Sequence, residues 1–82
     1  MSEQSELHND IANRFVMTVI GPAIKGGASY ADLMVIFETM QVAMMETLAR
    51  HYKLAPDVAS GLCEASLDRA IERFSAIRGR TN

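Results

Sequence analysis

Hydrophobic and polar positions along residues 30–53 follow the period of an α-helix. Large apolar residues recur three or four positions apart, so at about 100° per residue they gather on one broad face. The members of this face are Leu33, Met34, Phe37, Met40, Met44, Met45, Leu48 and Tyr52. The pattern predicts one long helix over residues 30–53. Ser29 and Asp32 have the spacing of a capping box and mark its beginning.

Further apolar residues widen this face on both sides. Val35 and Val42 lie on one flank, and Ile36 and Ala43 lie on the other. A helix that is apolar nearly all round is usually buried on several sides, and a chain of 82 residues has few elements to cover it. We therefore expect a homodimer, in which a second copy of the chain supplies part of the cover. The expected dimer interface contains Val35, Ile36, Val42, Met45 and Ala49. In the alternative, the other two helices of the same chain cover the face alone.

Two further helices are predicted on either side of this long one. The helical spacing of Leu7, Ile11, Phe15 and Val19 predicts a helix over residues 5–19, with residues 1–5 frayed. The third helix is expected over residues 56–78. It begins at Pro56, which suits the first position of a helix, and it stops at Gly79.

These elements predict an all-α fold with three helices in a single domain over residues 1–82. The short connection after residue 53 predicts an antiparallel hairpin of the second and third helices. Small residues of the third helix are expected to meet the Met- and Phe-rich face of the second. These are Ala59, Cys63, Ser66 and Ala70. The first helix would pack across the hairpin, and the whole would form a dimeric helical bundle.

A glycine-rich segment, residues 21–29, is expected to be the loop between the first two helices. Gly21-Pro22 is predicted to break the helix, and Gly26-Gly27 precedes the Ser29 cap. Free amides at a helix N-terminus can bind anions, so Lys25, Gly26, Gly27 and Ser29 are a candidate anion site. Gly27 and Ala28, however, stand where a phosphate-binding P-loop carries Lys and Ser or Thr. The pattern therefore favours a simple turn.

Catalytic, metal and cofactor sites are not indicated by the remaining residues. His8, His51 and the single Cys63 do not have the spacing of zinc ligands, and no carboxylate stands three residues from a His in the manner of di-iron bundles. Cys63 falls on the apolar face of its helix, where a cysteine is usually inert. We expect no enzymatic activity, no metal and no cofactor.

Net charge is −2, which argues against a general nucleic-acid binder. Arg69, Arg73, Arg78 and Arg80 make the C-terminal end basic, and complementation of the helix dipole explains them without a nucleic acid. Glu38, Gln41 and Glu46 interrupt the best candidate for a membrane span. The polar N-terminus lacks the features of a signal peptide, and the expected location is the cytoplasm.

Three functional hypotheses remain. The leading one is a small non-enzymatic protein that acts through protein–protein interaction, as a homodimer or through a helix of another protein. The second is a ligand- or anion-binding module that uses the loop over residues 21–29. The third is a weak nucleic-acid binder that uses the C-terminal arginines. Gln41, which points into the apolar face, also suits a polar pair that sets the register of two helices.

Overall fold

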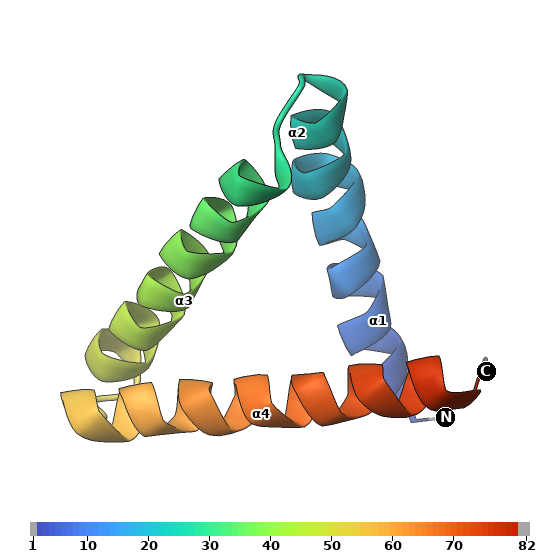
Figure 1. The fold of residues 1–82 in the computed structure, drawn as a ribbon. Coiled ribbons are helices and arrows are strands. Elements are labelled where there is room, and N and C mark those ends of the chain that lie inside the picture. Colours follow the sequence, from blue (N-terminus) through green and yellow to red (C-terminus); the bar gives the residue numbers. More distant parts are fainter. Residues whose placement is uncertain (1, 81–82) are drawn as a thin grey trace. The chain divides into compact units, whose positions relative to one another are not determined.

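The computed structural model describes residues 2–80; Met1, Thr81 and Asn82, at the ends of the predicted domain, lie outside the described residues. Its regular elements are all helices (Figure 1). In chain order they are α1 (Glu3–Phe15), η1 (Val16–Ile20), α2 (Gly21–Lys25), α3 (Tyr30–His51) and α4 (Pro56–Arg80). The predicted all-α class is confirmed for this part of the chain. The chain divides into two compact units, Met1–Phe37 and Glu38–Asn82. The hairpin and the dimeric bundle stay predictions.

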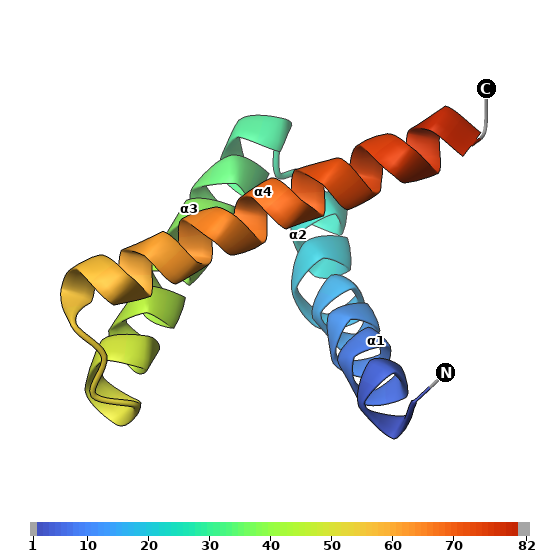
Figure 2. The same ribbon diagram turned by 90° about the horizontal axis from the view of Figure 1, so that it is seen from below.

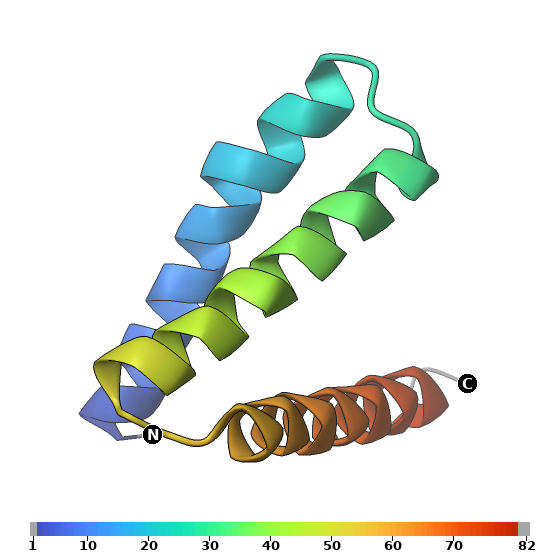
Figure 3. The ribbon, with the colours of Figure 1, turned by 90° about the vertical axis from the view of Figure 1, so that its left-hand side faces the viewer.

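The first helix is longer at both ends than the sequence indicated. It begins at Glu3, because the Ser2 side chain accepts a hydrogen bond from the Ser5 amide at 3.1 Å and caps the first turn. The structure thus places the first helical residue two positions before the predicted start at residue 5, and the fraying of residues 1–5 stays a prediction. At the other end the helix continues without interruption from α1 through η1 and α2, as Figure 3 shows. The prediction of a loop over residues 21–29 is wrong for Gly21–Lys25, which are helical.

A π-helical turn explains why Pro22 does not end this helix. In a regular α-helix the proline ring would clash with the carbonyl four residues back, which is that of Thr18. Residues Val16–Ile20 instead form a wider π-turn, and the Gly21 amide donates to the Val16 carbonyl, five residues back. A Cβ atom at Gly21 would lie 3.3 Å from that carbonyl oxygen, so the glycine gives the wide turn its room.

The turn between α2 and α3 is a Schellman motif. Gly27 has φ +95°, a conformation that favours glycine, and its amide donates to the Ile24 carbonyl at 3.0 Å. The Ala28 amide donates to the Ala23 carbonyl, also at 3.0 Å. These two bonds satisfy carbonyls at the end of α2 and reverse the chain, so the connection is short.

The predicted capping box begins α3. The Asp32 amide donates to Ser29 Oγ at 3.2 Å, and Asp32 Oδ2 accepts from the Ser29 amide at 2.9 Å and from its hydroxyl at 3.1 Å. Each residue thus satisfies a donor of the other that the helix itself leaves free. These two hydrogen bonds from Ser29 lower the pKa of the Asp32 carboxyl, because they stabilise its charged form.

The connection between α3 and α4 is equally short (Figure 2). Helix α3 ends at His51, two residues before the predicted position, because Lys53 adopts φ +58°. The Leu54 amide then donates to the Leu48 carbonyl at 3.3 Å. Pro56 begins α4 as predicted, but Gly79 does not stop it. The φ angle of Gly79 is not positive, so this residue continues the helix. A glycine within a helix lowers stability by only about 1 kcal/mol relative to alanine.

Few side chains are fully buried. Among the residues whose burial is described, Ala59 near the start of α4 is buried, at 1 % exposure. Phe15 of α1, Leu48 of α3 and Leu67 of α4 are half-buried. Most large apolar side chains are exposed, and some of them form the candidate site.

Candidate interaction surface

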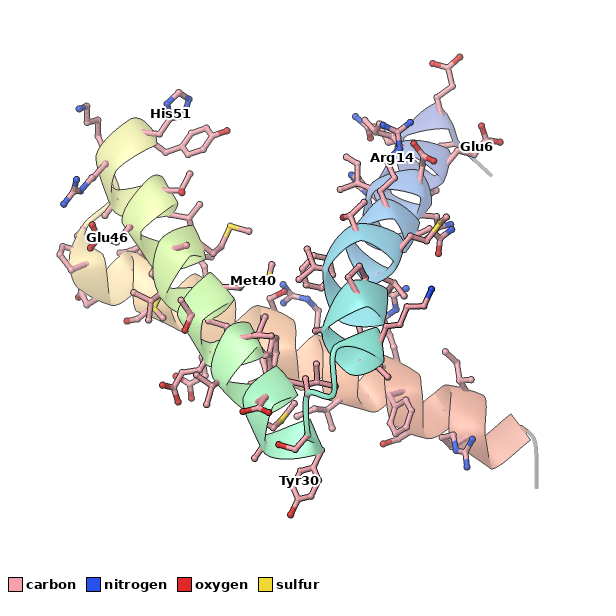
Figure 4. The ribbon with its side chains drawn as sticks, turned by 90° about the horizontal axis from the view of Figure 1, so that it is seen from above. Glu6, Arg14, Tyr30, Met40, Glu46 and His51 are labelled. Carbon is pink, nitrogen blue, oxygen red and sulfur yellow. The ribbon has the colours of Figure 1, made fainter. Side chains whose placement is uncertain are left out.

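Helix α3 exposes apolar side chains on more than one side. On its broad face Met34, Phe37, Met40 and Met44 are all exposed. On one flank Val35 is 60 % exposed and Val42 is 53 % exposed. Figure 4 shows the Met40 and Glu46 side chains leaving the helix on different sides. Because large exposed apolar patches mark interaction sites in soluble proteins, this helix is the candidate functional site.

The residues of the predicted dimer interface occupy two flanks of α3. Val35, Val42, Met45 and Ala49 recur seven, three and four residues apart and therefore form one stripe. Met45 and Ala49 are half-buried, whereas the two valines are exposed. Ile36 is half-buried and follows Val35 directly, so the helix turns it about 100° away, onto the opposite flank.

One charged residue lies within the valine stripe. Glu38 stands three residues after Val35 and four before Val42, at the position that completes the spacing. No side chain of the described residues forms an ion pair with it. The other carboxylates of α3 have partners. Glu46 Oε2 forms an ion pair with Arg50 Nε at 2.9 Å, and Asp32 accepts hydrogen bonds in the capping box. A lone carboxylate in an apolar stripe indicates that a cover for this flank must supply a polar or positive group there.

A second stripe of the same kind lies on α4, and the sequence analysis missed it. Val58 is 46 % exposed and Leu62 is 49 % exposed, and Ala65 and Arg69 follow them three and four residues further along. The spacing of four, three and four residues was available in the sequence as a signal. The sequence alone does not single out this stripe, because one inward face and the helix dipole already account for the apolar residues and the arginines of this helix.

The candidate anion site has no amide left to offer. The Gly26 amide donates to the Pro22 carbonyl at 2.9 Å, and the Gly27 amide donates to the Ile24 carbonyl. The Ser29 amide and hydroxyl both donate to the Asp32 carboxylate. An anion at these residues would have to displace these bonds and would meet the negative charge of that carboxylate. The geometry therefore gives the predicted set Lys25, Gly26, Gly27 and Ser29 no support as an anion site.

An open hollow of about 600 Å³ lies beside Lys25. Its lining residues are Met17, Gly21, Pro22, Lys25 and Gly26. They come from successive turns of one helix, so the hollow is the surface of that helix where glycine and proline leave little side chain. Binding pockets for small molecules are usually enclosed and formed by several elements, whereas this hollow is open and is formed by one helix.

The three arginines of α4 whose side chains the structure describes do not share one side of the helix. Arg69 and Arg73 are four residues apart and share a side of the helix, but Arg78 is turned about 140° from Arg73. Glu64, Asp68 and Glu72 run along a neighbouring side of the same helix. A negative stripe beside the arginines opposes the attraction of a phosphate backbone, so this arrangement does not favour a nucleic-acid interface.

Two further residues singled out in the sequence are Cys63 and His51. Cys63 is a half-buried free thiol on α4. His51 packs edge-on against Tyr52, with ring centroids 4.7 Å apart. Within residues 2–80 no three His, Cys, Asp or Glu side chains form a group that could hold a metal ion.

Comparison with known proteins adds no family. The chain matches no protein-family model, and searches of curated proteins and of solved structures found no match. None of the helices in the described part of the chain has the length and apolar character needed to cross a membrane.

Proposed function

We propose that this chain is a small non-enzymatic interaction protein that works as a homodimer, with α3 as the central element of the interface. One observation carries the proposal: Val35 and Val42 are exposed on the flank of a helix whose broad face is already apolar. A single helix with so wide an apolar arc needs neighbours on several sides. Closed two-fold dimers are the commonest way for a small chain to supply them.

Burial energetics support the same conclusion. Removing apolar area from water contributes about 25 cal/mol per Å², which corresponds to about 1.5–3 kcal/mol for one fully buried Val, Leu or Phe side chain. The exposed apolar side chains of α3 include Met34, Val35, Phe37, Met40, Val42 and Met44. Burying several of these side chains against a second copy would add a favourable free energy of this size for each one, and none of it is gained while they stay in water.

No second function is proposed, because the observations favour neither alternative. The amides of the candidate anion site already have acceptors within the chain. Of the described arginines of α4, Arg69 and Arg73 lie beside a stripe of carboxylates and Arg78 lies on another side of the helix. A helix of another protein is the alternative occupant of α3, and the experiment below distinguishes it from a second copy.

The test is the mass of the purified protein across a dilution series, measured by sedimentation equilibrium. We expect a dimer at micromolar concentration. Replacing Val35 and Val42 together by Asp should weaken the dimer by at least about 100-fold, because two charges would be buried without partners. The control is Ser60→Asp, which adds the same side chain at an exposed position of α4, about 160° around that helix from Val58 and Leu62, and should leave the dimer intact.

Two outcomes would contradict the proposal. A wild-type chain that is folded and monomeric at micromolar concentration would exclude the homodimer and leave a heterologous helix as the occupant. If the double variant keeps its circular dichroism spectrum and its dimeric mass, the interface lies elsewhere on the chain.

A further inference from the structure

Two stripes of the unit Glu38–Asn82 have matching lengths and compositions. Read backwards along α3, Ala49, Met45, Val42 and Glu38 are spaced by four, three and four residues. Read forwards along α4, a second set has the same spacing: Val58, Leu62, Ala65 and Arg69. Equal spacing in opposite directions is what two antiparallel helices need in order to pack a stripe against a stripe.

We infer that this flank of α3 packs antiparallel against α4 of the second copy, with Glu38 facing the partner's Arg69. The inference rests on the proposed homodimer and specifies which surface of the second copy covers α3. By two-fold symmetry the same contact forms twice, since each copy provides one α3 flank and one α4 stripe.

The apolar part of the two stripes is complementary in size. In this alignment Ala49 meets the partner's Val58, and Val42 meets the partner's Ala65. A small residue is thus opposite a large one at these two positions, while Met45 lies opposite the partner's Leu62. Alternation of small and large side chains across an interface fills the space between two helices without voids.

The charged part of the two stripes is complementary in sign. On its own helix Glu38 has Met34, Val35, Gln41 and Val42 three and four residues away, so no cation of α3 can reach it at those positions. Within the described residues, Arg69 of α4 likewise forms no ion pair. Each stripe therefore carries one unpaired charge, and the antiparallel alignment brings the two opposite charges together. A charge pair of this kind fixes register and selects the partner.

The burial of these residues favours the second copy over the same chain. All eight residues of the two stripes belong to one compact unit, and the connection from α3 to α4 is short. Val42, Val58 and Leu62 nevertheless remain about half exposed within it. The chain thus leaves part of each stripe exposed, and a second copy offers each of them its counterpart.

Charge reversal tests this pairing. Glu38→Arg and Arg69→Glu should each weaken the homodimer by at least about tenfold, because like charges would then face each other. An equimolar mixture of the two variants should recover the wild-type affinity to within about threefold. In that heterodimer every α3–α4 contact again has opposite charges. Sedimentation velocity of each variant and of the mixture measures this. The control is Glu64→Arg, the same change about 140° from Arg69 on α4, and it should leave the affinity unchanged.

The remaining outcomes separate the two levels of the proposal. If the single variants weaken the dimer and only the double variant Glu38→Arg/Arg69→Glu recovers, with no recovery in the mixture, the pair forms within one chain and the inference is overturned. Single variants with wild-type affinity and unchanged circular dichroism also overturn it, while the homodimer itself stands. A wild-type chain that is monomeric throughout would instead remove the homodimer on which the inference rests.

Discussion

At the residue scale the clearest determinant is the pair formed by Ser29 and Asp32. The two side chains exchange hydrogen bonds with each other's amides at the first turn of α3. Satisfying donors at a helix N-terminus typically stabilises a protein by about 1 kcal/mol. The sequence predicted this pair from its spacing alone, because a capping box is local and needs no knowledge of the rest of the fold.

The pair has a consequence for the pH dependence of stability. Since the pKa of Asp32 is lower in the folded chain than its ordinary value of 3.8, the folded state binds fewer protons near that pH. The stability that the carboxylate contributes is therefore present above about pH 4 and is lost as the pH falls below it. NMR titration should give an Asp32 pKa below 3.8.

Asp32→Asn provides the matched comparison. The variant should be less stable than wild type at neutral pH in urea unfolding, and the difference should shrink between about pH 4 and pH 2 as the wild-type carboxylate is protonated. A difference that stays constant over this range would show that the charge of Asp32 is not what stabilises the turn.

At the element scale, periodicity predicted the helices well and their ends less well. The start of α3 at its capping box and the start of α4 at Pro56 came from local signals that act within one turn. The end of the first helix was missed because Gly21-Pro22 usually breaks a helix. Whether a chain breaks or widens at a proline depends on the turn before it, and the π-turn at Val16–Ile20 has no comparable sequence signature.

This explanation predicts the effect of replacing Pro22. Pro22→Ala restores an amide donor and removes the clash that the wide turn avoids, so residues 16–20 should return to regular α-helical bonding. The change should raise stability by up to about 3 kcal/mol. Backbone NMR shifts of residues 16–20 and urea unfolding measure the two effects.

A second substitution makes the test specific. Gly21→Ala should be less favourable in the wild-type chain than in the Pro22→Ala background, because its Cβ atom would lie 3.3 Å from the Val16 carbonyl oxygen in the π-turn. In the Pro22→Ala background the same change should be neutral or stabilising, because alanine is the better helix former once the turn is regular. Equal effects of Gly21→Ala in both backgrounds would count against the π-turn.

The candidate surface was only half predictable for a related reason. The apolar width of α3, including Val35 and Val42, follows from the period of one helix. The α4 stripe that ends at Arg69 becomes meaningful only when it is set against a second helix in a chosen direction and register. The periodicity of one helix specifies neither the direction nor the register of a second helix. Glu38 and Arg69 therefore each look like an ordinary surface charge when each helix is considered by itself.

At the scale of the whole molecule, the exposed apolar side chains should couple folding to association. Ala59 is the fully buried apolar residue among those whose burial is described, and folding is driven mainly by such burial. A small chain that completes its core with a second copy has a stability that depends on its own concentration.

The melting temperature should therefore rise by about 4 °C for each tenfold increase in protein concentration, given the unfolding entropy of two chains of this size. Calorimetry or circular dichroism over a hundredfold range of concentration measures this shift. In Val35→Asp/Val42→Asp the melting temperature should be lower and should no longer depend on concentration, because mass action ends with the dimer. A wild-type melting temperature that stays constant over the same range would mean that one chain buries enough apolar area to fold by itself.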